Sequence, residues 1–535
     1  MPAIEDAADE LNCDFFLESK DYIKLLAQKK VLLPISVRNL YGYEGVILNI
    51  LEICRLSKAK VHLIIYDDVN LNTRRRLLLL IKYRTIVRQT LTYCESFTEK
   101  FKDSVSVNFY SMQKSAQNSP VKSSYSVSQI LKLCPELYRS IHATWFGRNW
   151  KTLSFHVKGP REKCSLRNEI SKFNLGFTLI DELSRNNNYD FVFVPNGKYP
   201  DQVGIKYRSK TANFQILYFE HDNGRTFLQK FQTQNMKCMK SALRNWTKTL
   251  NSSEELKWIN WADNWVLQQK TNSFQNQFLR HNSQFNISDK ALKDHLDKID
   301  KPLIVIFTSS IDERVSNLSI DLNGWASQGA AIVECAKKIK LDGFYPHVRL
   351  HPNMQWKSLR DLLEIIKFLE QINISYQLPW EGPDTYWLLE KSKSIVTWGS
   401  TVGLESMAMG IPTYNLGLSK YQDIVRIPTF TKSTLHRFNF NSPILPHVRK
   451  VKLAIFATKN YGLQDLIHTT LNNPHKKRIK LIKLLNKKSS FIMMINMIQN
   501  PLKSSSRDVF RVLAFFFGSF AAKKILVNLS RYIKL

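Results

Sequence analysis

The fold is decided by the stretch Ser394-Ile-Val-Thr-Trp-Gly-Ser-Thr-Val-Gly-Leu-Glu-Ser-Met-Ala-Met-Gly-Ile-Pro412. Residues 394 to 398 are apolar and β-prone, which predicts a buried parallel strand because the run is too short for a helix. Gly399 allows a sharp turn, and a short helix is expected from near Val402 to a stop at Gly410. The pattern is typical of a strand-turn-helix unit in an α/β sheet.

The turn between this strand and this helix carries two hydroxyl residues, Ser400 and Thr401. Either of them can cap the helix, since a side-chain oxygen accepts from the first free N–H groups. The same free N–H groups and the positive helix end favour an anion. The sequence therefore predicts a phosphate site here, and a plain βαβ turn is the alternative.

A second polar segment ends a strand that is expected to begin near Tyr345. It places Arg349, His351 and Asn353 at or beside the carboxyl edge, where open α/β sheets bind their ligands. Arginine offers a planar fork for phosphate oxygens, and a neutral histidine donates one hydrogen bond. The alternative is that Arg349 and His351 share one strand face and pair with acidic neighbours.

A third segment follows an apolar strand predicted over residues 303 to 307. It reads Thr308-Ser309-Ser310 and leads toward a helical stretch that begins at Trp325. From the residues alone this is a polar loop that can cap the next helix through Ser310 or Asp312. A role of Ser309 and Ser310 in binding is implied only by a family resemblance.

The motif G-S-T-x-G-x-E with its later G-x-P resembles glycosyltransferases of two Rossmann-like domains, the GT-B fold, in particular those of capsule and surface-polysaccharide synthesis. Arg-x-His-Pro-Asn resembles the His-Pro signature of the same enzymes and of teichoic-acid glycerophosphotransferases. The resemblance implies a nucleotide-sugar donor and no cofactor. It also implies that the donor diphosphate is bound by residues of all three segments: Ser309, Ser310, Arg349, His351, Asn353, Gly399, Ser400, Thr401 and Gly403.

Glu405 lies beside this predicted phosphate site. Phosphates would repel its carboxylate, so we expect it to point toward the ribose hydroxyls, for which it is a suitable acceptor. The alternative role is stabilisation of the helix dipole, worth roughly 0.3–1 kcal/mol.

Predicted strands and helices also alternate in the first half of the chain. Residues 31 to 36 predict a strand, Tyr41-Gly-Tyr-Glu-Gly45 a loop, and residues 46 to 56 a helix. Later strands are expected to end in Asn-Gly-Lys-Tyr199 and in Glu220-His221-Asp222. A base for the acceptor is expected from this half, and Glu220 or His221 is favoured over Glu44.

The predicted fold class is therefore α/β, with two Rossmann-like domains and a basic helical C-terminal tail. We expect an N-terminal domain over residues 1–285, a nucleotide-sugar-binding domain over 286–445 and the tail over 446–535. The 44% hydrophobic content excludes a disordered chain, and seven scattered cysteines without a C-x-x-C favour a reducing cytoplasm over a zinc site.

The formal charge of +32 requires an anionic partner. No nucleic-acid motif is found, and neither a signal peptide nor a run of about 20 apolar residues that could span a membrane is seen. An anionic membrane surface or an anionic acceptor is the preferred partner, with a cytoplasmic location peripheral to the inner membrane. The aromatic and basic tail of residues 507–526 suits a helix lying in the interface, or one packed back onto the protein.

No D-x-D occurs, so no metal site is expected. The chain is predicted to be a metal-independent glycosyltransferase that acts on a growing cell-surface polysaccharide or a lipid-linked acceptor. The alternatives are a nucleotide-sugar 2-epimerase of the same fold, a polyol-phosphate transferase, and a non-catalytic module that binds glycan or lipid.

Overall fold

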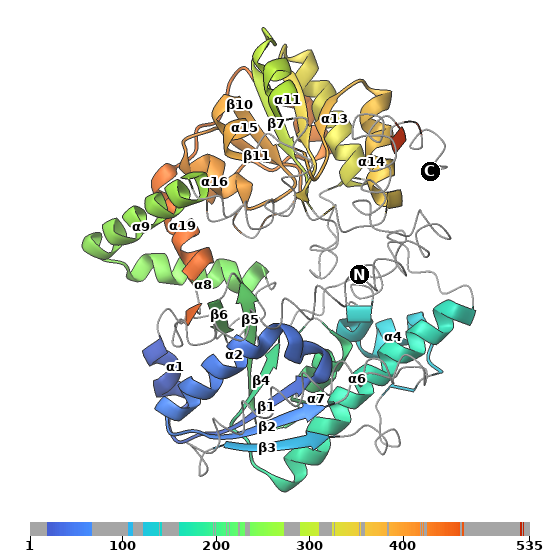
Figure 1. Cartoon of the computed structure of the whole chain (residues 1–535), viewed down its shortest axis with the longest axis vertical. Helices are drawn as coiled ribbons and strands as arrows, with labels where there is room; N and C mark the ends of the chain where they lie inside the picture. Colours follow the sequence, from blue (N-terminus) through green and yellow to red (C-terminus); the bar gives the residue numbers. More distant parts are fainter. Residues whose placement is uncertain are drawn as a thin grey trace. The chain divides into compact units, whose positions relative to one another are not determined.

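A computed structural model of the chain describes residues 19–66, 105–110, 121–141, 160–229, 236–271, 289–309, 324–421, 425–460, 463–464 and 525–528, with short gaps inside several of these ranges. The chain divides into two compact units. The division falls inside one helix, between Ala242 and Leu243, and the first unit also includes a short segment that begins at Lys459. Each unit is described separately below (Figure 1).

The first unit alternates strands and helices. Its strands are β1 (Lys30–Ser36), β2 (Lys60–Tyr66), β3 (Val105–Tyr110), β4 (Phe191–Pro195), β5 (Gln215–Asp222), β6 (Arg225–Gln229) and β12 (Leu463–Gln464). Its helices are α1 (Ser19–Leu25), α2 (Val37–Leu56), α4 (Val127–Leu133), α6 (Pro160–Asn186) and α7 (Pro200–Ser209). The described strands form a seven-stranded sheet in the order β12-β6-β5-β4-β1-β2-β3, in which the pairs β5–β6 and β6–β12 are antiparallel and the other pairs are parallel.

Alternating apolar residues cover both faces of this sheet, as a parallel sheet buried on both faces requires. Val31, Leu33 and Ile35 of β1 pack in one cluster with α1 and α2. Leu32 packs on the opposite side, in a cluster with α6 and α7. The first α/β half predicted from the sequence is therefore present.

One predicted loop of this unit is wrong. The residues Tyr41 to Gly45 were expected between strand and helix, but α2 begins directly after β1, at Val37, and includes them. Glycine is disfavoured inside a helix by only about 1 kcal/mol, and packing of the apolar face of α2 against the sheet outweighs that cost. Glu44 therefore lies in a helix rather than in an open loop.

The second unit is a doubly wound α/β domain. Its strands are β7 (Leu303–Phe307), β8 (Tyr345–Arg349), β9 (Ser375–Gln377), β10 (Ser392–Thr397) and β11 (Thr413–Asn415). Its helices are the second half of α8 (Met236–Thr249), then α9 (Ser252–Thr271), α11 (Asp289–Asp297), α13 (Gln328–Leu341), α14 (Leu359–Gln371), α15 (Thr385–Lys391), α16 (Val402–Ala408), α18 (Lys432–Arg437) and α19 (Val448–Asn460). The described strands form a five-stranded sheet, parallel throughout, in the order β11-β10-β7-β8-β9.

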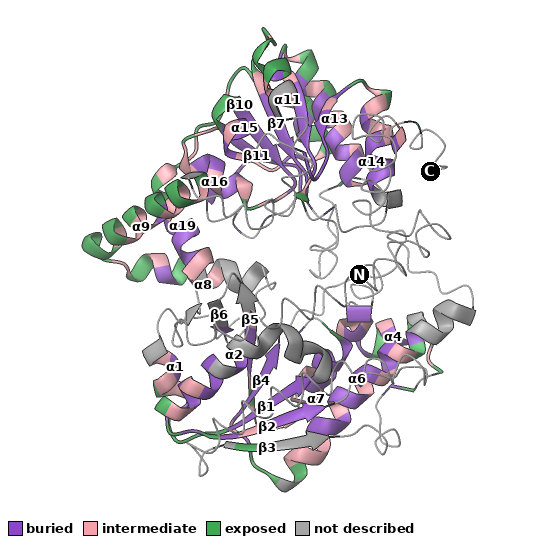
Figure 2. Cartoon of the chain, in the orientation of Figure 1, coloured by how far each residue is buried: buried purple, intermediate pink, exposed green. Residues whose placement is uncertain are grey.

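Both faces of the second sheet are covered by helices, and the strands are buried almost without interruption (Figure 2). Ile304 and Ile306 of β7 pack with α13 and α14 on one face. Val305 and Phe307 pack with α11 and α15 on the other. Two α/β units with mainly parallel sheets are the GT-B-like fold class that the sequence predicted.

The three tryptophans of α9, Trp258, Trp261 and Trp265, are spaced so that they share one face of the helix. Trp258 stacks on Phe456 of α19 with ring centroids 4.0 Å apart, and Trp261 meets the same ring edge-on at 5.2 Å. Arg449 and Lys452 of α19 pair with carboxylates of α9 as well. This tryptophan face is thus a packing surface within the second unit.

The domain boundaries stay a prediction. Helix α9 belongs to the second unit, earlier than the expected boundary after residue 285, and the residues at that boundary lie outside the described ones. Most of the tail also lies outside them. Leu526 is fully buried in the cluster that contains α13 and α14. Among the helices that the structure describes, none is long and apolar enough to cross a membrane.

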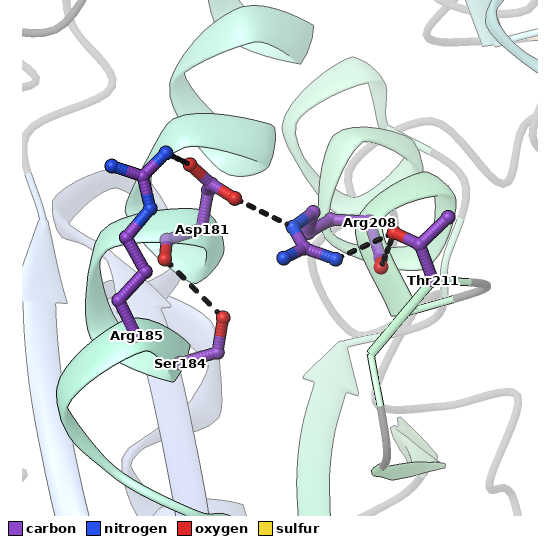
Figure 3. Close-up of polar contacts among 5 residues, drawn as sticks. All are labelled: Asp181, Ser184, Arg185, Arg208 and Thr211. Atoms are coloured by element: carbon purple, nitrogen blue, oxygen red, sulfur yellow. Dashed lines mark hydrogen bonds and ion pairs between the residues drawn. The ribbon is translucent and has the colours of Figure 1, made fainter.

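Asp181 links the two helices that cover one face of the first sheet (Figure 3). Its two carboxylate oxygens accept from Arg208 Nε of α7 at 2.8 Å and from Arg185 Nη2 of α6 at 2.5 Å. Arg208 also donates to Thr211 Oγ1 at 2.5 Å. The Arg208 side chain is 19% exposed and that of Arg185 is 61% exposed, so water screens the second pair far more.

We therefore expect Arg208→Ala to lower the free energy of unfolding by about 1–2 kcal/mol, because it leaves a mostly buried carboxylate without its partner on α7. Arg185→Ala, which removes the same type of group from the same carboxylate, is the matched control and should cost less than about 0.5 kcal/mol. Urea unfolding followed by circular dichroism measures both. Equal costs for the two variants would contradict the proposed difference in screening.

Candidate functional site

The order of strands in the second sheet defines one position where the direction of winding reverses. The chain builds β7, β8 and β9 outward on one side, then crosses back to place β10 on the other side of β7 and β11 beyond it. Loops that leave β7 and β10 therefore diverge at their carboxyl ends. Open α/β sheets bind ligands in the crevice at such a switch point.

The turn after β10 lies on one side of this switch point. The N–H of Trp398 donates to the Phe307 carbonyl of β7 at 3.0 Å, which keeps the two strands paired up to the turn. Gly399 has φ +66°, in the left-handed region that favours glycine, as the sharp turn predicted from the sequence requires. Its N–H donates to Thr397 Oγ1 at 3.2 Å. Ser400 is half-buried and Thr401 is exposed.

The helix after this turn is shorter and less open at its N-terminus than a phosphate-binding helix would be. It has seven residues, and the N–H groups of Gly403 and Leu404 already donate to the carbonyls of Ser400 and Thr401. Thr401 makes no side-chain cap, and Ser400 Oγ accepts from the Val402 N–H at 3.4 Å. Anion binding here would rest on the loop hydroxyls more than on the helix end.

A tyrosine holds the turn from behind. Tyr421 Oη donates to the Ser400 carbonyl. A Cβ on Gly403 would lie 2.6 Å from the same Oη, so the glycine is what allows this approach. Thr397 Oγ1, which accepts from the Gly399 N–H, donates in turn to Asn415 Oδ1 at 2.6 Å. The turn is thus fixed by buried polar contacts from β10, β11 and the loop beyond.

The loop after β7 lies on the other side of the switch point. Thr308 and Ser309 are 1% and 5% exposed. Thr308 Oγ1 accepts from the His351 N–H at 2.8 Å, and the Thr308 N–H donates to the Arg349 carbonyl at 3.1 Å. These bonds join the loops after β7 and β8 into one edge, as the sequence predicted from the ends of both strands.

Arg349 differs from its expected surroundings. The residue is 5% exposed, and its Nη1 donates to the Leu378 carbonyl beyond β9 at 2.7 Å. The guanidinium therefore helps to hold the end of the neighbouring strand. His351, by contrast, is half-buried at the edge.

Glu405 is half-buried in the first turn of α16. Its Oε2 accepts from Tyr386 Oη of α15 at 2.7 Å. Sequence reasoning missed Tyr386 and Tyr421, since neither belongs to a recognisable motif. The sequence holds one weak signal for each: Tyr386 lies near the start of a helix that follows a strand, and Tyr421 lies in a loop that follows a strand.

The remaining predicted residues are only partly described. Ser310 and Asn353 lie outside the described residues. Glu220 is half-buried in the first unit and lies one position beyond the last residue of β5 that pairs with β4. This end of β5, which we call the β5–β6 arm, pairs antiparallel with β6. The backbone of His221 lies in the same arm, and its side chain is not described. The described residues contain no group of three or more His, Cys, Asp or Glu side chains that could hold a metal ion.

No protein-family model and no curated protein matches this chain. Solved structures do show similarity. The β-Kdo 2,7-transferase KpsC of Thermosulfurimonas dismutans is 10% identical over 62% of this chain and 87% of its own, with a TM-score of 0.31. A putative UDP-N-acetylglucosamine 2-epimerase of Listeria monocytogenes is 11% identical over 82% and 92%, with a TM-score of 0.28. An α,α-trehalose-phosphate synthase of Burkholderia vietnamiensis is 8% identical over 81% and 91%, with a TM-score of 0.29. These identities are too low to carry an inference about activity.

The contact between Gly403 and Tyr421 gives a test of how the turn is held. Gly403→Ala should lower the free energy of unfolding by about 1–3 kcal/mol, because the new methyl group overlaps the phenol oxygen. Tyr421→Phe should cost about 1 kcal/mol through the lost bond to Ser400. The double variant should cost at least about 1 kcal/mol less than the sum, because the overlap disappears with the oxygen. Strictly additive costs in urea unfolding would argue against this packing.

Proposed function

We propose that this protein is a metal-independent glycosyltransferase that moves a sugar from a nucleotide-sugar donor to a growing cell-surface polysaccharide or a lipid-linked acceptor. The observation that carries the proposal is the switch point of the second sheet, flanked by the Thr308–Ser309 loop and the Gly399–Thr401 turn. A strand edge of that kind, with hydroxyl residues on both loops, suits a nucleoside diphosphate. The sequence motifs of the same loops support a sugar nucleotide as the donor.

In this proposal each residue at the edge has a chemical task. Hydroxyls of Ser400 and Thr401 donate to the diphosphate, and His351 donates one further hydrogen bond. Ser309 borders the base or the phosphates. Glu405 accepts from the ribose, because phosphates would repel its carboxylate. Arg349 contributes through the position of the loops, since it holds the Leu378 carbonyl.

The transfer itself needs a base and a stabilised leaving group. Glu220, or His221 beside it, takes the proton of the acceptor hydroxyl while that oxygen bonds to the anomeric carbon of the donor. The bond from this carbon to the diphosphate breaks, and the nucleoside diphosphate leaves with the electron pair. Preorganised donors at the switch point lower the cost of the charge that develops on it. A cytoplasmic position at a membrane surface is part of the same proposal.

The donor site is tested by turnover with a panel of UDP-, GDP-, ADP- and CDP-sugars. We expect one donor to be consumed, and His351→Ala and the double change Ser400→Ala with Thr401→Ala each to lower kcat/KM by at least about tenfold, since a tenfold loss is about 1.36 kcal/mol of transition-state stabilisation. His436→Ala is the matched control, because its side chain is 52% exposed on α18 and pairs with Glu334. Unchanged kcat/KM in both site variants, with folded protein, would refute the donor site.

Activity should also survive chelation. The proposed site stabilises the leaving diphosphate with hydroxyl and imidazole donors, so EDTA in roughly a thousandfold excess over trace metal should leave kcat within about twofold. The measurement is donor consumption before and after dialysis against EDTA. Complete loss of activity with rescue by Mn²⁺ or Mg²⁺ would contradict the metal-independent mechanism. Conversion of the donor into its 2-epimer without release of a nucleoside diphosphate would favour the epimerase.

A further inference from the structure

Tyr386 is a buried tyrosine that the proposed chemistry does not use directly. It is the second residue of α15 and is 5% exposed. Its ring belongs to a cluster with Val305 and Phe307 of β7 and Ile395 of β10. Tyr386 therefore packs against both strands that flank the switch point, and its ring has little freedom to move.

The phenol of Tyr386 ends on a carboxylate rather than on the backbone. Tyr386 Oη donates to Glu405 Oε2 at 2.7 Å, and the contact is partly buried. Hydrogen bonds to an ionised acceptor are shorter and about twice as strong as neutral ones. Because the ring is fixed by packing, this bond fixes the rotamer of Glu405 and the plane of its carboxylate.

A carboxylate held in this way still has acceptor capacity to offer. A carboxylate has two oxygens and about four lone-pair sites, so one phenol does not exhaust its capacity to accept hydrogen bonds. At the switch point the carboxylate would be repelled by a diphosphate but would bind neutral hydroxyl donors. A ribose carries two such hydroxyls side by side, which suits two oxygens in one fixed plane.

We propose that Tyr386 is a positioning residue that holds Glu405 for the ribose hydroxyls and thereby determines the preference for ribonucleotides over deoxyribonucleotides. The proposal rests on the proposed function, since it needs a nucleotide at the switch point. Tyr386 contacts no substrate itself. Its effect should therefore appear in the discrimination between sugars of the nucleotide and not in the chemical step.

The experiment uses the full-length protein and isothermal titration calorimetry. UDP, GDP, ADP and CDP are titrated first, and the tightest of the four is compared with its 2′-deoxy and 3′-deoxy analogues. We expect wild-type protein to bind the ribonucleotide at least about tenfold more tightly than one of the deoxy analogues, as for loss of a hydrogen bond to a charged group. Tyr386→Phe should reduce that ratio to about threefold or less, by weakening binding of the ribonucleotide alone.

Two variants provide the controls. Tyr345→Phe removes the same atom from a tyrosine at the opposite, amino-terminal end of β8, where its hydroxyl meets His295 at 3.3 Å, and should leave the ratio unchanged. Glu405→Gln keeps the length of the side chain and should lower the ratio as Tyr386→Phe does. Thermal unfolding of each variant verifies that it is folded.

The outcomes separate this inference from the proposed function. If wild-type protein binds none of the four nucleotides, the proposed function fails, and this inference fails with it. If the protein binds a nucleotide and Tyr386→Phe keeps the wild-type ratio, the role of Tyr386 is refuted while the donor site stands. The same conclusion follows if Glu405→Gln alone lowers the ratio. Lower ratios in both variants, with Tyr345→Phe unchanged, would support the inference.

Discussion

The pairing of β10 with β7 is the interaction on which the rest of the second unit depends. β7 is paired on both sides, with β8 and with β10, although β10 is the fourth strand of this sheet in chain order. The chain adds β8 and β9 on one side of β7 and then, by a crossover, adds β10 on the other side. The direction of winding therefore reverses between β9 and β10. The bond from the Trp398 N–H to the Phe307 carbonyl continues the pairing of β10 with β7 to the point where both loops begin. Without this pairing the two polar loops would not share one edge.

Polar contacts behind this edge make the loops rigid. Thr397 joins the Gly399 N–H to Asn415 of β11, and Tyr421 holds the Ser400 carbonyl. Buried polar groups are costly unless they are paired, so a network of this kind permits only a narrow range of backbone positions. Thr308 plays the same part between β7 and β8. The cost of such polar residues in a core is understandable if the edge must present hydroxyl and carboxylate groups in fixed positions.

The fold could be predicted well where apolar runs end in turn residues. The strand expected over residues 303–307 is β7 without change, and the one expected over 394–398 is β10, shifted to 392–397. The predicted loop around Gly42 was wrong, because burial of an apolar face can carry a helix through glycine. The candidate site, inferred from polar residues at strand ends, stays a prediction. Arg349 shows what a local sequence pattern cannot predict: its guanidinium donates to the Leu378 carbonyl, 29 residues further along the chain.

The sequence by itself determined the α/β class, the strands that lead to the site and the polar residues that follow them. These properties are local: they depend on apolar runs, glycine turns and helix stops within a few residues. Only the tertiary structure decided which strands are neighbours and therefore that Tyr386 reaches Glu405 and Tyr421 reaches Ser400. Such contacts join segments that are separated along the chain. The packing of helices on the sheet sets them, and no local pattern encodes that packing.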